Sequence, residues 1–266
     1  MIYYKGDFMK RKVKELKRIA RSNLTGNYTI LMRAYIWLNM LILLVEMPFS
    51  MMQNDIAFSS QNIIYRVAQV LISVLSVILV CGQYRMHLSV ARTGKAEFKD
   101  FWEPLKNQPD RYIITNFILF GITLICLLPM FGGLWLWYQN DSLENTLIAL
   151  GLSCISVVLY TCAALNFNLV FFLMIDDQTL TAVNALKSTY HMVMHYKKRY
   201  LYLQLSFLGY MFLNLLTFGI GILWIESYMT QTITLFYLDI KGELDAVQTE
   251  RRKNETIEPT TFNAYV

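Results

Sequence analysis

Two charged side chains inside long apolar stretches are the first candidates for chemistry in this sequence. Glu46 lies near the end of one apolar stretch, and Arg66 lies near the start of the next one. On insertion scales, a charge at the centre of a membrane-spanning helix costs about 2.5–3.5 kcal/mol, so such residues are usually paired or functional. Antiparallel neighbouring spans would place Glu46 and Arg66 at a similar depth. The two residues then form either a structural ion pair or a site coupled to a proton or a substrate.

A pair of histidines has the spacing of a partial metal site. His191 and His195 are four residues apart, which places both rings on one helix face. Lys187 and Lys198 share that face, and nearby positive charge opposes both a metal ion and a protonated imidazole. No Cys or carboxylate is placed to complete a ligand set. We therefore expect no metal, no other cofactor and no catalytic constellation, and we expect the protein not to be an enzyme.

The third candidate is a basic segment near the start of the chain. Residues 8–24 have apolar side chains at helical spacing, namely Met9, Val13, Leu16 and Ala20. The opposite side is basic and contains Lys10, Arg11, Lys14 and Arg18. A basic amphipathic helix of this kind binds the anionic headgroups of an inner leaflet. The alternative is a helical connector packed beneath a helix bundle.

Two further segments have a similar character. Residues 98–105 are short and aromatic, and residues 179–196 have an apolar stripe. The stripe consists of Leu180, Val183, Leu186, Tyr190 and Val193. Each of the three amphipathic segments precedes a pair of long apolar segments. The layout therefore predicts three hairpins, each preceded by a cytoplasmic amphipathic helix.

The elements that hold these residues are predicted to be transmembrane helices. Charged residues make up 16% of the 266 residues, whereas soluble domains contain about a quarter. Six segments are apolar over the length of about 20 residues that crosses a bilayer core: 28–50, 62–84, 112–138, 143–175, 200–218 and 222–238. Backbone groups in lipid must be paired within the protein, so these segments should be helices. We expect an all-α polytopic membrane protein with a basic amphipathic helix at 1–27, a membrane domain at 28–240 and a polar, disordered tail at 241–266.

The positions of the basic residues predict the orientation. Of the 24 Lys and Arg residues, only Arg33 and Arg66 lie outside the segment before the first span, the second and fourth predicted connections and the tail. The connections at 51–61, 139–142 and 219–221 contain no Lys or Arg. Basic connections stay in the cytoplasm, so both termini are predicted to be cytoplasmic. Because the cations follow the spans, the net charge of +5 is not expected to serve nucleic-acid binding.

Several stretches resemble one known family. One is the basic segment from Leu16 to Tyr28, which ends in Gly-Asn-Tyr. The others are Ala185–Ser188, Leu205–Tyr210, Leu216–Trp224 and Phe236–Tyr237. In order and spacing they resemble the bacterial membrane-protein family known as domain of unknown function 975, over about residues 10–240. The family pattern usually has a proline before Tyr228, where this chain has Ser227.

The resemblance implies a multi-pass protein of the bacterial cytoplasmic (plasma) membrane and supplies no activity. From the basic segments we expect a non-enzymatic membrane protein whose partners are anionic membrane lipids or other membrane proteins. The alternative is a small-molecule transporter or channel. Polar amides within the predicted spans, such as Asn39, Gln69 and Asn116, keep that alternative open.

Overall fold

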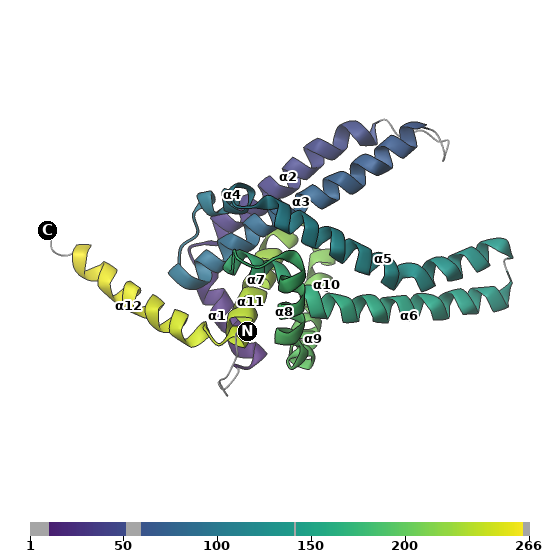
Figure 1. Ribbon diagram of the computed structural model, residues 1–266. Coiled ribbons are helices and arrows are strands. Elements are labelled where there is room, and N and C mark those ends of the chain that lie inside the picture. Colours follow the sequence, from purple (N-terminus) through teal and green to yellow (C-terminus); the bar gives the residue numbers. More distant parts are fainter. Residues whose placement is uncertain (1–10, 52–59, 141, 263–266) are drawn as a thin grey trace. The chain divides into compact units, whose positions relative to one another are not determined.

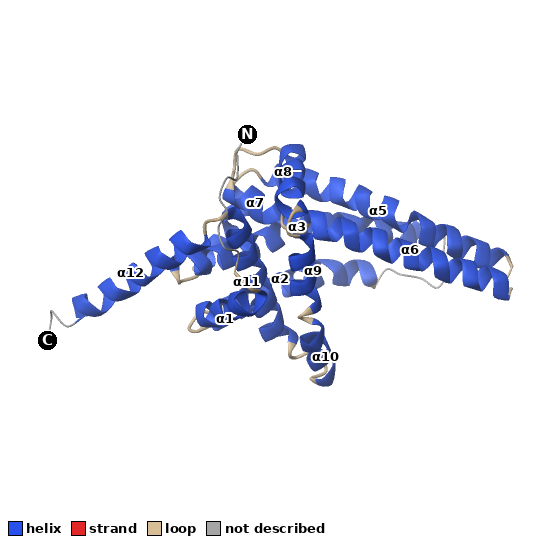
Figure 2. Ribbon diagram, turned by 90° about the horizontal axis from the view of Figure 1, so that it is seen from below, coloured by secondary structure: helices blue, strands red, loops and turns tan. Residues whose placement is uncertain are grey.

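A computed structural model describes residues 11–51, 60–140 and 142–262 (Figure 1). These residues form twelve helices and no strand (Figure 2), which confirms the prediction of an all-α protein for the described part of the chain. The chain divides into two compact units. The first consists of Met1–Pro109 and Leu201–Val266, and the second of Asp110–Tyr200. Helix α9 (Lys197–Leu205) runs across the boundary between them.

The first unit is built around helix α11 (Ile222–Lys241), most of which is buried from Ile225 to Ile240. Helices α1 (Val13–Leu24), α2 (Tyr28–Ser50) and α3 (Ser60–Thr93) pack against α11. Helices α10 (Leu208–Leu216) and α12 (Leu244–Phe262) precede and follow it in the chain and also contact it. Helix α4 (Phe98–Lys106) packs on α3 and α2.

The close packing of α4 on α3 depends on one glycine. A Cβ atom at Gly82 would lie 2.1 Å from the main-chain oxygen of Phe101, so any larger residue would clash with the backbone of α4. Phe101 is buried, and an ion pair of 2.6 Å between Arg85 and Glu103 joins the same two helices. The aromatic segment predicted at 98–105 is therefore a helix whose apolar side faces protein.

Helices α2 and α3 form a hairpin that is buried at one end and exposed at the other. Leu31, Ala34 and Leu38 are buried in α2, whereas the residues nearer its end, such as Leu43 and Leu44, are exposed. The first half of α3 is likewise lined with exposed Ile, Val and Leu side chains. A helix that is apolar all round is typical of a membrane span, so the exposed part of this hairpin has the surface of a membrane segment.

The second unit contains helices α5 (Pro109–Gln139), α6 (Leu143–Phe167), α7 (Val170–Asp176) and α8 (Ala182–Met194). Helices α5 and α6 run side by side in both views (Figures 1 and 2). They approach closely at Gly133, where a Cβ atom would lie 2.9 Å from Cα of Ala149. Next to Pro129, the N–H of Met130 donates a hydrogen bond of 2.9 Å to Oγ of Ser156 on α6. Small residues and interhelical hydrogen bonds of this kind are what joins helices in lipid.

Helix α8 corresponds to the amphipathic segment predicted at 179–196, but the buried face differs from the predicted stripe. Leu186 and Val193 are buried as expected, whereas Val183 and Tyr190 are exposed. Ala182, Ala185 and Thr189 complete the buried face instead. Their small side chains let α8 approach α6 and α7, against which it packs.

Four helical segments of the described chain are long and apolar enough to cross a membrane: Tyr28–Pro48, Asn62–Thr93, Pro109–Gln139 and Leu143–Asp176. They correspond to the first four predicted spans, as expected for a membrane protein. The other two predicted spans are not confirmed. The segment 200–218 is divided into α9 and α10 by a turn at Ser206 and Phe207, and 222–238 lies in the mostly buried helix α11.

The predicted disorder of the tail at 241–266 is wrong for most of its length. Residues Leu244–Phe262 form helix α12. Leu244 is 2% exposed, and Glu243 accepts from both Arg92, at 3.1 Å, and Lys241, at 2.6 Å. The polar composition suggested a solvated chain, but ion pairs with Arg11, just before α1, and with Arg92 on α3 hold the start of this helix within the first unit.

Candidate functional site

Helix α1 has one buried side and one exposed, basic side. Leu16, Ala20 and Leu24 are fully buried, and α1 packs mainly on α11. The exposed side has cations at positions four and seven residues apart, which together we call the basic face: Lys14, Arg18 and Arg21. The apolar side is thus covered by protein, as in the connector interpretation, and only the basic face is open to other molecules. Lys10, the first of the predicted lipid-binding cations, lies outside the described residues.

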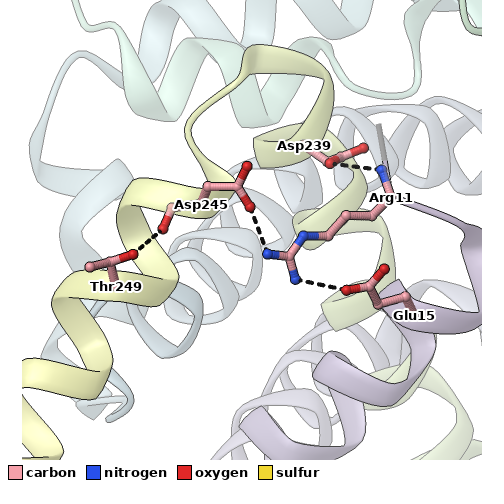
Figure 3. A network of polar contacts seen from close by, with 5 residues as sticks. All are labelled: Arg11, Glu15, Asp239, Asp245 and Thr249. Atoms are coloured by element: carbon pink, nitrogen blue, oxygen red, sulfur yellow. Dashed lines mark hydrogen bonds and ion pairs between the residues drawn. The ribbon is translucent and has the colours of Figure 1, made fainter. Parts of the chain in front are cut away.

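Arg11, another predicted lipid-binding cation, is engaged by carboxylates of the protein (Figure 3). Its guanidinium donates to Glu15 at 3.1 Å and to Asp245 at 2.6 Å. Its main-chain N–H points to Asp239 at 3.4 Å, and the hydroxyl of Thr249 donates to the main-chain oxygen of Asp245 at 2.9 Å. Arg11 therefore joins α1 to the start of α12 and is not part of the basic face.

Lys17 of α1 caps the break between α9 and α10. In a continuous helix the N–H of Tyr210 would pair with the carbonyl of Ser206, but it donates to Phe207 instead, at 2.9 Å. The ammonium group of Lys17 donates to the freed oxygen of Ser206 at 2.9 Å and lies 4.1 Å from the ring centroid of Phe207. Burial lowers the pKa of Lys17, and the positive charge of Arg21 lowers it further.

Arg21 extends this contact to an aromatic cluster formed by Phe207, Tyr210 and Tyr228. The three ring centroids are 5.5–6.0 Å apart. Arg21 donates to the hydroxyl of Tyr210 at 2.9 Å, and its Cζ lies 5.3 Å from the ring centroid of Tyr228. A guanidinium over aromatic faces is a favourable cation–π arrangement. The basic face of α1 is thereby held beside the exposed apolar side chains of α10, and this pairing of charge with apolar surface suits a lipid.

A second polar group lies in the core of the first unit, between α3 and α11. Gln83 and His87 are one turn apart on α3, and Nδ1 of His87 lies 2.7 Å from Oε1 of Gln231 on α11. All three side chains are buried, and the Nε2 atom of each has no hydrogen-bond partner. Sequence reasoning missed Gln83 and His87. Their four-residue spacing was visible, but nothing in the sequence indicated which helix they face.

The predicted pair of Glu46 and Arg66 lies on neighbouring helices. Glu46 is half-buried on α2 and Arg66 is exposed on α3, and these two helices pack against each other. No ion pair joins these two described side chains, so their pairing stays a prediction.

The two histidines with metal-site spacing are both exposed. His191 lies on α8, and His195 is the residue that follows the helix. Within residues 11–51, 60–140 and 142–262, no three His, Cys, Asp or Glu side chains come together closely enough to hold a metal ion.

Comparison with known families settles which family the chain comes from. A family model described as "Protein of unknown function (DUF975)" matches residues 9–243. The chain belongs to this family. The resemblance recognised in the sequence is thus confirmed. Comparisons with curated proteins and with solved structures gave no match.

All but one of the stretches that resemble the DUF975 family lie in the first unit, and Ala185–Ser188 lies in the second. The basic segment is α1, which supplies Lys17 and Arg21, and the stretch Leu205–Tyr210 is the break that they contact. Ser227 replaces the proline of the family pattern. The hydroxyl of Ser227 donates to the main-chain oxygen of Leu223 at 3.2 Å, and α11 runs without a break from Ile222 to Lys241.

Proposed function

We propose that this DUF975 protein is a non-enzymatic, multi-pass protein of the bacterial cytoplasmic membrane that binds anionic lipid headgroups through the basic face of α1. The exposure of Lys14 and Arg18, on a helix whose apolar side is already buried, carries the proposal. A helix fixed in this way does not need to fold or insert in order to bind, so its cations are preorganised. Each cation near an anionic surface contributes about 1 kcal/mol.

The test compares two pairs of charge removals in the purified full-length protein. Lys14→Gln with Arg18→Gln removes two cations of the basic face, and Lys187→Gln with Lys198→Gln removes two exposed cations of the second unit. Retention of phosphatidylglycerol is measured by native mass spectrometry, with phosphatidylcholine as the neutral lipid. We expect the first pair to weaken phosphatidylglycerol binding roughly tenfold or more and the second pair to leave it nearly unchanged. Equal effects of the two pairs would remove the basic face from the proposal.

We further propose that both termini are cytoplasmic, on the strength of the basic connections. Cysteine labelling tests this in a variant in which the four free cysteines are replaced by alanine. A cysteine at exposed Asn140 should react with an impermeant maleimide added to intact cells, and one at Lys95 should not. The reverse pattern would overturn the orientation. The predicted count of six crossings does not affect this test, because any even number leaves both termini on one side.

The buried polar group favours the alternative of a transporter or channel. Gln83, His87 and Gln231 leave unpaired nitrogen atoms inside the first unit, and polar groups in a membrane protein often mark an ion or proton path. Proteoliposomes containing a pH-sensitive dye provide a direct test. Proton flux that His87→Phe abolishes would support conduction through this group. Flux no higher than in protein-free liposomes would count against proton conduction.

A further inference from the structure

We propose that α10 and the first turns of α11, residues 208–228, form a re-entrant hairpin that enters the acyl chains of one leaflet and returns without crossing the bilayer. The membrane-crossing helices then number four instead of the six predicted from the sequence. That the hairpin enters the cytoplasmic leaflet follows from the proposed orientation of the chain.

The surface of the hairpin is suited to acyl chains. Residues 200–225 contain no Lys, Arg, Asp or Glu. Large apolar side chains are exposed around α10 and the following turn, and exposure is greatest near the tip: Leu215 75%, Leu216 76%, Phe218 97% and Ile220 65%. A tip that lay in water beyond the outer leaflet would expose these side chains to solvent, whereas acyl chains would cover them.

The backbone of the tip is also hydrogen-bonded in the way that the hydrocarbon core of a membrane requires. Every N–H group from Thr217 to Ile222 donates a hydrogen bond within the hairpin. The left-handed conformations of Phe218 and Gly219 close the turn. The N–H of Gly219 donates to the main-chain oxygen of Asn214 at 2.9 Å. The hydroxyl of Thr217 accepts from Gly221 at 3.0 Å. Hydrocarbon requires such internal pairing, whereas a loop in water does not.

The contact of α1 with α11 limits how far α11 can extend into the bilayer. Arg11 lies beside Asp239, and Arg21 lies over Tyr228, so α1 runs along α11 between these two points. That part of α11 is therefore at the depth of Lys14 and Arg18, which are exposed and cannot remain in hydrocarbon. Only the stretch before Tyr228 is left for the bilayer, and it is about 10 Å long.

Helix α2 gives an independent measure of the depth. Helix α11 packs against α2, whose described buried residues, Leu31, Ala34 and Leu38, all lie in its first half. Beyond Leu38, α2 continues to Ser50, which is about 18 Å further at 1.5 Å per residue. Helix α11 begins at Ile222, within one turn of its first buried residue, Ile225. The hairpin therefore stops well short of the far end of α2, while a crossing requires about 30 Å.

The cations at the base of the hairpin lie at the depth that the proposal assigns to the membrane surface. Lys17 and Arg21 contact Phe207 and Tyr210, where the chain leaves α9 for α10. Cations at this position lie at the level of lipid phosphates when the tip is among acyl chains. The hairpin then contacts the acyl chains of one leaflet, and the basic face of α1 contacts the headgroups of the same leaflet.

A depth profile of single spin labels tests the proposal in the full-length protein. Cysteines replace Leu208, Phe212, Leu216 and Ile220 one at a time in the variant without native cysteines, and the labelled proteins are reconstituted into phosphatidylglycerol and phosphatidylcholine vesicles. Accessibility to oxygen and to a water-soluble nickel complex gives the depth of each label. Cysteines at Asn140 and Lys95 serve as aqueous references for the two sides, and their labelling in cells reports the orientation separately. Gly221 is avoided, because a Cβ atom there would lie 2.7 Å from Oγ1 of Thr217.

A re-entrant hairpin predicts that depth increases steadily from Leu208 to Ile220, with Ile220 shielded from the nickel complex and from impermeant maleimide on both sides. A transmembrane pair predicts instead that depth is greatest near Leu208 and Phe212 and that Ile220 is as accessible as Asn140. That second profile would overturn the proposal. Nickel accessibility at all four positions would overturn it as well, because the hairpin would then lie outside the bilayer. Gel filtration of each variant in detergent identifies any variant that is not folded, and the remaining positions still decide between the profiles.

Discussion

The ammonium group of Lys17 and the main-chain oxygen of Ser206 are joined by a hydrogen bond of 2.9 Å. This bond connects two residues separated by most of the chain and places the basic helix α1 at the point where α9 ends. Without it, the carbonyl of Ser206 would lack the partner that the break in the helix removes.

Replacing Lys17 by Met should therefore destabilise the first unit. The loss of a charged hydrogen bond and of the contact with Phe207 is expected to lower the free energy of unfolding by about 1–2 kcal/mol, since the site is only partly buried. Unfolding in a detergent titration, followed by tryptophan fluorescence, gives the measurement. Lys14→Met is the matched control on the exposed side of the same helix. An equal loss of unfolding free energy in Lys14→Met would contradict this prediction, because removing any positive charge from α1 would then destabilise the unit to the same extent.

The contact between Arg11 and Asp245 should show measurable but modest coupling. Asp245 is 62% exposed, so solvent screening limits the pair to about 0.2–1 kcal/mol. A double-mutant cycle with Arg11→Gln and Asp245→Asn isolates that energy, and it should shrink in high salt. Limited proteolysis should cut α12 faster in either variant, because its start is less firmly held. Strict additivity of the two changes would show that the pair contributes nothing in solution.

Gly82→Ala should be among the most damaging small substitutions in the chain. The added methyl group would lie 2.1 Å from the oxygen of Phe101, so α3 and α4 would have to separate. We expect a loss of about 3 kcal/mol, at the upper end for overpacking. Gly121→Ala is the control, because a Cβ atom there meets no other atom within 4 Å. That change should be neutral or stabilising by up to about 1 kcal/mol, since it favours the helix. Equal stability of the two variants would contradict the predicted contact.

Two serines on α6 should respond differently to replacement by alanine. Ser156 accepts from the N–H of Met130 on α5, whereas Ser153 donates to Ala149 within its own helix. Ser156→Ala should cost about 0.6–2 kcal/mol, the range for interhelical hydrogen bonds in membranes. Ser153→Ala should be close to neutral. The comparison is made by thermal unfolding of both variants in the same detergent. If Ser156→Ala left the stability unchanged, close packing at Gly133 alone would hold α5 and α6 together.

The sequence by itself determined the all-α fold, the family and four membrane-length helices. These follow from local properties, because an apolar run of about 20 residues has few stable conformations in lipid. The amphipathic character of residues 8–24 was also visible, since helical spacing places Leu16 and Ala20 on one side. The spacing did not show whether lipid or protein covers that side.

Only the tertiary structure decided what the polar residues contact. Arg11 and Lys14 look alike in the sequence, yet one is paired with Asp245 and the other is exposed. The last two apolar segments likewise have the length of spans, but α11 is buried along α1 and the preceding helix breaks at Ser206. Hydropathy is a sum over neighbouring residues, whereas burial depends on partners distant in the chain. The depth of a helix beside a charged neighbour can therefore be read only once the two have been placed together.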